Sequence, residues 1–196
     1  MGKKAIIWFS VLIGLILVVP FLWGTYNKLI TREEVVKSAW AQVENQSKRR
    51  TDLIPNLVET VKGYAEHEQE TYSKVIEARA KATQLNIDAS NLTPENLQQF
   101  SQAQNELSQS LSRLMAIIEN YPDLKANENF IMLQGQLEGT ENRIAVERKR
   151  FNETVKSYNT YRRRFPKNIA AAIFGFKERK YFEAEEAADI PSAVDF

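Results

Sequence analysis

The sequence contains no cysteine and a single histidine, His67. Without cysteine there can be no disulfide, no thiolate nucleophile, no Cys-based metal site and no lipid anchor on Cys. A serine triad needs a histidine within a larger constellation, and the di-metal site of helical bundles needs two Glu-x-x-His pairs, whereas the residue three positions before His67 is Tyr64. No glycine-rich phosphate loop occurs either. We therefore expect no enzymatic activity, no metal site and no cofactor.

Glycine is also scarce, with 7 residues in a chain of 196. Gln, Glu, Lys, Arg, Ala and Leu are abundant instead, and these residues favour helices over turn-rich sheets. The composition predicts an all-α protein. The formal net charge of +1 lacks the cationic excess that binding to a nucleic-acid backbone requires, so we expect no nucleic-acid partner.

One long uncharged run, at residues 5–23, stands apart from this polar composition. About 19 helical residues span roughly 28 Å, which matches the hydrocarbon core of a bilayer. A cleaved secretory signal is the alternative, because Lys3 and Lys4 resemble its basic start. The run is longer than the usual signal, however, and it ends in bulky aromatic residues where a cleavage site needs small ones. We predict a short basic N-terminus, residues 1–4, and a retained transmembrane helix, residues 5–24.

Charge says little about the orientation of this helix in the membrane. Lys3, Lys4 and the terminal amine on one side are matched by Lys28, Arg32 and Lys37 on the other. A short basic N-terminus before a first helix weakly favours a body outside the cytoplasm. We expect a protein that crosses the membrane once.

Between residues 31 and 165, apolar residues recur at alternating spacings of three and four. This pattern predicts long helices packed side by side, and short links between such helices favour antiparallel neighbours. We predict a long up-and-down antiparallel four-helix bundle over residues 25–166. If Gly63 instead lies inside one helix from residue 32 to 88, the bundle has three helices of unequal length.

Helix ends are marked most clearly in the second half of the chain. Residues 93–95 (TPE) place an N-cap, a first-turn proline and an early acid in the order expected at a helix start. Pro122 follows the expected end of that helix, and Pro166 follows the end of the last one.

Polar residues interrupt the apolar stripes at a similar height in the predicted bundle. Suppose that the first helix runs away from the membrane from residue 31 and that the last helix runs back to it, ending at residue 165. Arg50 and Glu147 then lie at the same distance from the membrane, and Gln104 lies at the same distance as residue 48. Because an isolated buried charge is costly, we expect Arg50 to pair with Glu147. The layer would fix the register of the helices rather than bind a ligand. Its predicted members are Ser47, Arg50, Gln104 and Glu147.

The C-terminal tail, residues 167–196, joins an apolar patch at 169–176 to an acidic end that we expect to be disordered. The patch either folds back onto the bundle or lies on the membrane or a partner. In the four-helix topology the last helix returns to the membrane, so basic residues there either contact anionic lipid or only complement the helix dipole. The predicted membrane-surface contacts are Lys28, Arg32, Arg162, Arg163, Arg164 and Lys167.

Several blocks of this sequence, in the same order, resemble the LemA family. They are residues 26–29 (YNKL), 39–46 (AWAQVENQ), 49–58 (RRTDLIPNLV), 121–126 (YPDLKA), 137–144 (LEGTENRI), 158–160 (YNT) and 165–166 (FP). The resemblance covers nearly the whole chain after the predicted anchor. It implies a single-pass protein of the bacterial inner membrane with a four-helix bundle, no established enzymatic activity and a poorly defined molecular role.

Two kinds of function remain open at this point. The first is a membrane-tethered interaction or scaffold module with a protein partner of unknown identity, because the chain offers a long rigid surface, an anchor and no catalytic constellation. The alternative is a protein that binds or remodels a lipid surface through the apolar patch and the base of the bundle.

Overall fold

The computed structural model describes residues 2–85, 87, 89 and 92–182, and these residues form helices and connecting segments without a strand. The all-α prediction is confirmed. The helices are α1 (Lys3–Lys62), the short 3-10 helix η1 (Glu66–Glu68), α2 (Gln69–Gln84), α3 (Pro94–Ile118), α4 (Pro122–Lys125), α5 (Glu128–Arg163) and α6 (Lys167–Ile173). The acidic end of the tail lies outside the described residues.

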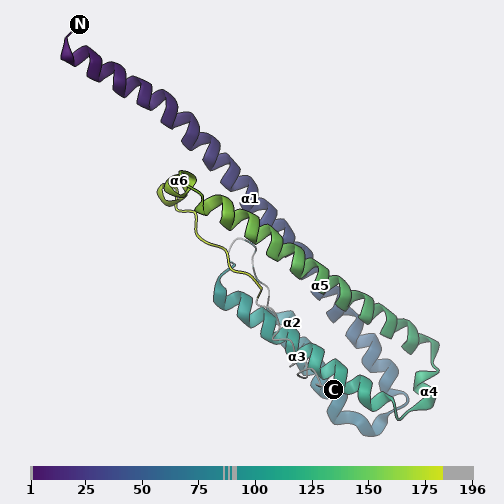
Figure 1. Cartoon of the computed structure of the whole chain (residues 1–196). Coiled ribbons are helices and arrows are strands. Elements are labelled where there is room, and N and C mark those ends of the chain that lie inside the picture. The colour runs from purple at the N-terminus through teal and green to yellow at the C-terminus, as the bar shows by residue number, and fades with distance from the viewer. Residues whose placement is uncertain (1, 86, 88, 90–91, 183–196) are drawn as a thin grey trace, which may run out of the picture.

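Helix α1 runs unbroken from the predicted anchor into the body of the molecule (Figure 1). Its 60 residues include Pro20 and Pro55, and the buried positions keep their spacing past Pro55 at Leu57 and Val61. The N-terminal part projects beyond the other helices and exposes large apolar side chains such as Trp8, Leu17 and Trp23. Among the described residues, α1 is the one helix that is long and apolar enough to cross a membrane.

The chain turns back after Lys62 instead of continuing as one helix to residue 88. The backbone N–H groups of Tyr64 and Ala65 donate to the carbonyl of Val61 at 3.0 and 2.9 Å and close the helix end. The short η1 follows, and α2 then packs against α1. Residues 32–88 therefore contain two separate long helical stretches rather than one.

Helices α3 and α5 begin at side-chain caps. The Thr93 hydroxyl accepts a hydrogen bond from the Asn96 N–H at 3.2 Å, with Pro94 in the first turn, and the Asn127 side chain accepts from the Phe130 N–H at 3.1 Å. Helix α5 packs along α1, whereas α2 packs mainly against α3. The end of α5 thus returns to the region from which α1 projects (Figure 1).

The half of the body far from the projecting part of α1 has a core drawn from four helices. Leu57 of α1, Val75 of α2, Leu114 of α3 and Leu133 of α5 belong to one buried cluster. Removing these aliphatic side chains from water is the main favourable contribution to the stability of this half.

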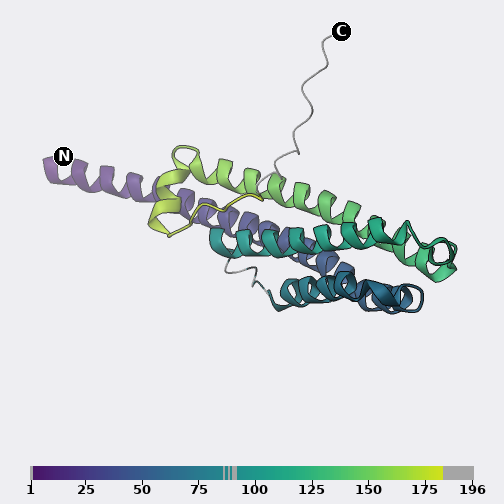
Figure 2. The ribbon, with the colours of Figure 1, turned by 90° about the horizontal axis from the view of Figure 1, so that it is seen from below.

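The near half has a different core, because the chain after α6 enters it. We call residues 174–182 the C-terminal strap; it runs back along the bundle from α6 (Figure 2). Its last residue, Phe182, stacks on Trp40 with 5.8 Å between ring centroids, and Phe100 and Phe151 lie 5.0 and 5.9 Å from the same indole. The described members of this cluster come from α1, α3, α5, α6, the strap and Ile87, and none from α2.

Candidate membrane-proximal site

Helix α6 lies against the bundle at the point where α1 projects from it (Figure 1). Ala170 and Ala171 are buried among the contacts with α1 and α5, whereas Ile169 and Ile173 are exposed, Ile173 at 64%. Positions four apart share one face of a helix, so the two isoleucines form an apolar edge. This edge lies beside the base of the projecting helix.

Aromatic contacts join α1 to the start of the strap. The Tyr26 ring lies edge-on to Phe174 and Phe176, with centroids 5.0 and 5.8 Å apart. An apolar hollow of about 460 Å³ lies beside them, lined by Val19, Leu22, Trp23, Tyr26, Asn27 and Phe174. The patch at 169–176 therefore folds onto the bundle and still keeps part of its apolar surface exposed.

The six predicted membrane-surface cations all lie on the segments that meet at this end of the molecule, but they divide into two groups. Lys28, Arg163 and Arg164 are exposed. The other three side chains, Arg32, Arg162 and Lys167, are half-buried.

The half-buried cations hold the site together. Arg32 and Lys167 both lie over the Tyr161 ring, at 4.8 and 4.1 Å from its centroid. Cations so placed are attracted to the electron-rich face of the ring. Arg162 donates from Nε to the Phe176 carbonyl at 2.9 Å. Their charges are therefore engaged within the protein, which leaves the exposed group as the stronger candidates for lipid contact.

The strap leaves α6 through Gly175, whose φ of 74° is a left-handed conformation that favours glycine. Beyond it, the Tyr158 hydroxyl donates to the Lys177 carbonyl at 2.8 Å. Burial raises the pKa of Tyr158 above its usual value, and the nearby Glu33 carboxylate adds to this effect. The hydroxyl therefore stays protonated, as a donor to the strap, at neutral pH.

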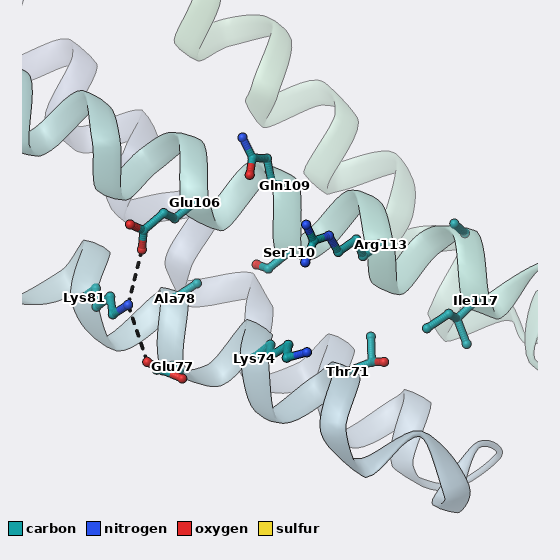
Figure 3. Close-up of a pocket in the computed structure, with 11 residues that line it drawn as sticks. Thr71, Lys74, Glu77, Ala78, Lys81, Glu106, Gln109, Ser110, Arg113 and Ile117 are labelled. Atoms are coloured by element: carbon teal, nitrogen blue, oxygen red, sulfur yellow. Dashed lines mark hydrogen bonds and ion pairs between the residues drawn. The ribbon is translucent and has the colours of Figure 1, made fainter.

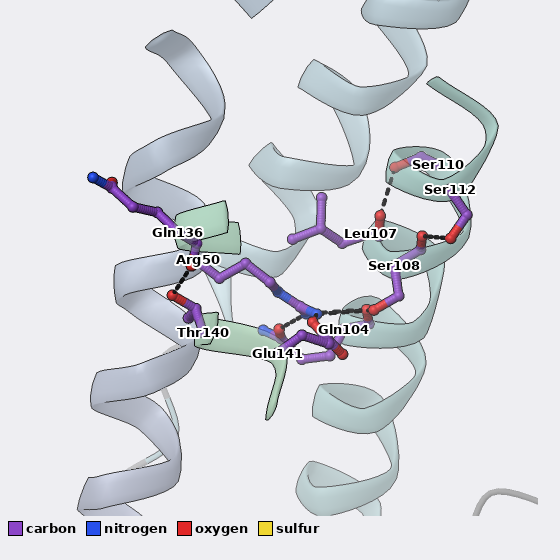
Figure 4. Close-up of polar contacts among 9 residues, drawn as sticks. All are labelled: Arg50, Gln104, Leu107, Ser108, Ser110, Ser112, Gln136, Thr140 and Glu141. Atoms are coloured by element: carbon purple, nitrogen blue, oxygen red, sulfur yellow. Dashed lines mark hydrogen bonds and ion pairs between the residues drawn. The ribbon is translucent and has the colours of Figure 1, made fainter. Parts of the chain in front are cut away.

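Arg50 is a charged residue buried in the bundle, and its side chain joins three helices (Figure 4). From α1 its guanidinium donates to the Gln104 side-chain oxygen and, at 3.2 Å, to the Gln104 carbonyl, both on α3. It also donates to the Ser108 hydroxyl at 2.8 Å and to the Glu141 carboxylate on α5. Of the predicted layer, the structure thus brings Arg50 and Gln104 together.

The expected ion pair between Arg50 and Glu147 is wrong, because Glu141 takes that place. Glu147 lies 3.9 Å from Arg150 on its own helix. Ser47 is buried one turn before Arg50, and its hydroxyl has no hydrogen-bond partner within the part of the chain that the structure describes. The sequence pattern located the buried arginine and glutamine but missed Glu141.

The error lies in the register of α5 against α1. Trp40 lies beside Phe151, and Arg32 lies over Tyr161. The prediction places residues 31 and 165 at the same level. Relative to that prediction, helix α5 is shifted by about one and a half turns toward the projecting end of α1. A carboxylate six positions earlier, at residue 141, is consequently level with Arg50.

A second surface feature is a groove of about 510 Å³ between α2 and α3 (Figure 3). It carries charges of both signs: the Lys81 amine lies 3.4 Å from Glu77 and 3.4 Å from Glu106. No group of three His, Cys, Asp or Glu residues in the described ranges is placed to hold a metal ion. The groove lining consists of Thr71, Lys74, Glu77, Ala78, Lys81, Glu106, Gln109, Ser110, Arg113, Ala116 and Ile117.

Comparison with known proteins gives relatives that align with most of this chain. Magnetosome protein MamQ of Magnetospirillum gryphiswaldense is 26% identical over 91% of this chain and 72% of its own length. Magnetosome protein MamQ 1 of Paramagnetospirillum magneticum is 26% identical over 85% of this chain and 67% of its own. Protein LemA of Metamycoplasma hominis is 25% identical over 83% of this chain and 71% of its own.

The family comparison agrees with the motif blocks. The model of the LemA family matches residues 39–196, which includes the aromatic cluster around Trp40, Arg50 and the whole of α5. The apolar projecting part of α1 precedes the matched region and indicates attachment to a membrane. The chain is therefore a membrane-associated member of the LemA family.

Proposed function

We propose that this protein is a single-pass protein of the bacterial inner membrane whose bundle is a rigidly tethered, non-enzymatic interaction module. The observation that carries the proposal is the continuity of α1. The same helix exposes Leu17 and Val18 in its projecting part and buries Leu29 and Val36 in the bundle. No flexible linker separates the projecting part of α1 from the bundle. The orientation of the anchor in the membrane would therefore fix that of the bundle, and the two would move as one body.

The body offers a suitable interaction surface for such a role. The α2–α3 groove combines apolar residues such as Ala116 and Ile117 with the charged Lys81 and Glu106. Protein interfaces commonly combine apolar and charged side chains in this way. The bundle would present this surface at a fixed height above the membrane.

Photo-crosslinking in intact bacteria tests the proposed function. A photoreactive residue in place of the exposed Gln109, in the α2–α3 groove, should yield a discrete protein product on illumination. A matched position on α5, the exposed Lys149, should yield at least fivefold less of it. Deleting residues 2–24 should abolish the product if tethering matters. Equal, diffuse products from both positions would contradict a specific interaction surface.

Binding to a lipid surface is a second candidate, and one specific observation favours it. The exposed Arg163 and Arg164 lie next to exposed apolar side chains, Phe165 at 80% and Ile169 on α6. Cations beside an apolar edge are the combination that interfacial membrane-binding helices use. We propose that this edge rests in the headgroup region beside the anchor.

Removing the two exposed arginines should weaken vesicle binding. Each basic residue near an anionic surface contributes about 1 kcal/mol, so Arg163→Gln with Arg164→Gln should cost about 2 kcal/mol, roughly 30-fold at low ionic strength. The measurement is flotation of the body, residues 25–196, with vesicles containing phosphatidylserine, at low and high salt. Arg143→Gln with Lys149→Gln removes two charges from exposed positions of α5 and serves as the control. Unchanged binding of the first variant would leave only the helix-dipole role for these arginines.

A further inference from the structure

The C-terminal strap is held in a groove that has the properties of a peptide-binding site. It lies against α5 and α1 and reaches the first turns of α3, in the half of the bundle whose core has no α2 side chains (Figure 2). Beyond Phe176 the strap is neither helix nor strand, and the backbone groups of three of its residues, 177, 179 and 182, pair with side chains of α5 instead. The strap is thus bound in the manner of an extended peptide ligand.

Two asparagines of α5 recognise the strap through its backbone. The Asn152 side chain accepts from the Phe182 N–H at 2.8 Å and donates to the Phe182 carbonyl at 3.1 Å. The Asn159 side chain does the same with Arg179, accepting from its N–H at 3.1 Å and donating to its carbonyl at 2.7 Å. An amide that pairs with both polar groups of one residue reads an extended backbone whatever the side chain is.

The spacing of the two clamps matches the spacing of their ligands. Asn152 and Asn159 are seven residues apart on α5, which is about 10.5 Å along a helix axis. Arg179 and Phe182 are three residues apart, which is about 10 Å in an extended chain. Both clamps can therefore close on one extended segment at the same time. On the same helix, the Tyr158 hydroxyl donates to the carbonyl of residue 177, and the Arg162 side chain donates to the carbonyl of residue 176.

Two side-chain pockets add selectivity to this backbone recognition. The Phe182 ring enters the aromatic cluster between Trp40 and Phe151, with 5.3 Å between its centroid and that of Phe151. The Arg179 guanidinium forms an ion pair with the half-buried Glu33 of α1. The groove thus selects a basic residue followed, three positions later, by an aromatic one.

We propose that this groove is a binding site for an extended segment of a partner protein with that pattern, and that the strap is its intramolecular occupant. The inference rests on the proposed interaction function and names the chemistry of the partner. A tethered segment acts at an effective concentration of the order of millimolar, so a partner binds only when it outcompetes the strap or when the strap is loosened. The strap therefore keeps the groove closed to weak ligands.

Peptide binding to the full chain, purified in detergent micelles, tests this proposal. The probe is a fluorescent peptide with the sequence of residues 174–182 (FGFKERKYF), followed by anisotropy. A full chain whose strap is loosened by Arg179→Ala and Phe182→Ala should bind the probe at least tenfold more tightly than the unaltered chain. Adding Asn152→Ala and Asn159→Ala should reverse this gain at least tenfold. A probe with alanine in place of its last phenylalanine is the matched control and should bind at least tenfold more weakly.

A second variant, with a smaller change, tests the proposal even if the double substitution destabilises the fold. Arg179→Gln leaves the aromatic cluster and the groove intact and removes only the ion pair between the strap and Glu33, and it should raise probe affinity severalfold. Equal probe affinity in the unaltered, Arg179→Gln and loosened chains, with normal helix content, would overturn the proposal. The photo-crosslinking product at Gln109 reports on a different surface, so its persistence in that case would leave the interaction function standing and remove only this site.

Discussion

Replacing Arg50 by alanine should lower the free energy of unfolding of the bundle by about 3–5 kcal/mol, whereas Glu141→Gln should lower it by only about 1 kcal/mol. The two residues form one ion pair, but their side chains are 2% and 53% exposed. Loss of Arg50 leaves a cavity and deprives the buried Gln104 oxygen of its donor. Glu141→Gln removes the counter-charge but keeps a side-chain oxygen that can accept from Arg50, the hydrogen bonds to α3 remain, and water reaches this half-exposed site.

Urea unfolding of the body, residues 25–196, followed by circular dichroism measures both changes. Arg49→Ala alters the exposed neighbour of Arg50 and should stay within about 0.5 kcal/mol of the unaltered body. Equal losses for Arg50→Ala and Glu141→Gln would mean that the ion pair itself, and not the hydrogen bonds to α3, carries the stability of this layer.

Trp40→Ala should have an effect of similar size, about 3–5 kcal/mol, and should also release the strap. The Trp40 side chain is 0% exposed, and its ring contacts three phenylalanines, one of them the strap residue Phe182. Its indole N–H also donates to the Ile87 carbonyl at 3.2 Å. The substitution removes the largest side chain of the near half of the core and the surface on which the strap ends.

Urea unfolding and limited proteolysis together check this prediction. Cleavage by trypsin after Arg179 or Lys180 should become at least tenfold faster in Trp40→Ala, because the strap must leave the groove to reach a protease. Trp40→Phe retains an aromatic surface and should cost less than half as much. Val146→Ala on the exposed side of α5 should change neither measurement. Proteolysis at the unaltered rate would show that the strap is held without the aromatic cluster.

Local signals in the sequence were sufficient for most of the helix boundaries. The cap at Thr93 and the proline after it determine where α3 starts, and both act through neighbouring backbone groups. Pro122 and Pro166 follow the ends of α3 and α5, as predicted, and stand at the starts of α4 and α6 for equally local reasons. The apolar spacing also identified the buried arginine and glutamine, because it depends only on the helix repeat.

The register of α5 and the position of the strap could not be obtained in this way. How far α5 slides along α1 depends on how Trp40 and Phe151 pack across two helices, and no single segment encodes that. The strap is not periodic, so it has no signature of its own. Asn152 and Asn159 were the available signal: two amides seven apart lie on one helix face, where aliphatic residues would otherwise be expected to pack.

The unbroken helix α1 also gives the protein a lever arm in the proposed membrane arrangement. From residue 24 to Lys62 the helix is about 57 Å long, so a 10° change in the tilt of the anchor would displace the far end of the bundle by about 10 Å. Transmembrane helices adjust their tilt to bilayer thickness. A modest change in bilayer thickness would thus displace the far end of the bundle by a distance comparable to the diameter of a helix. A protein in contact with that end could respond to the displacement.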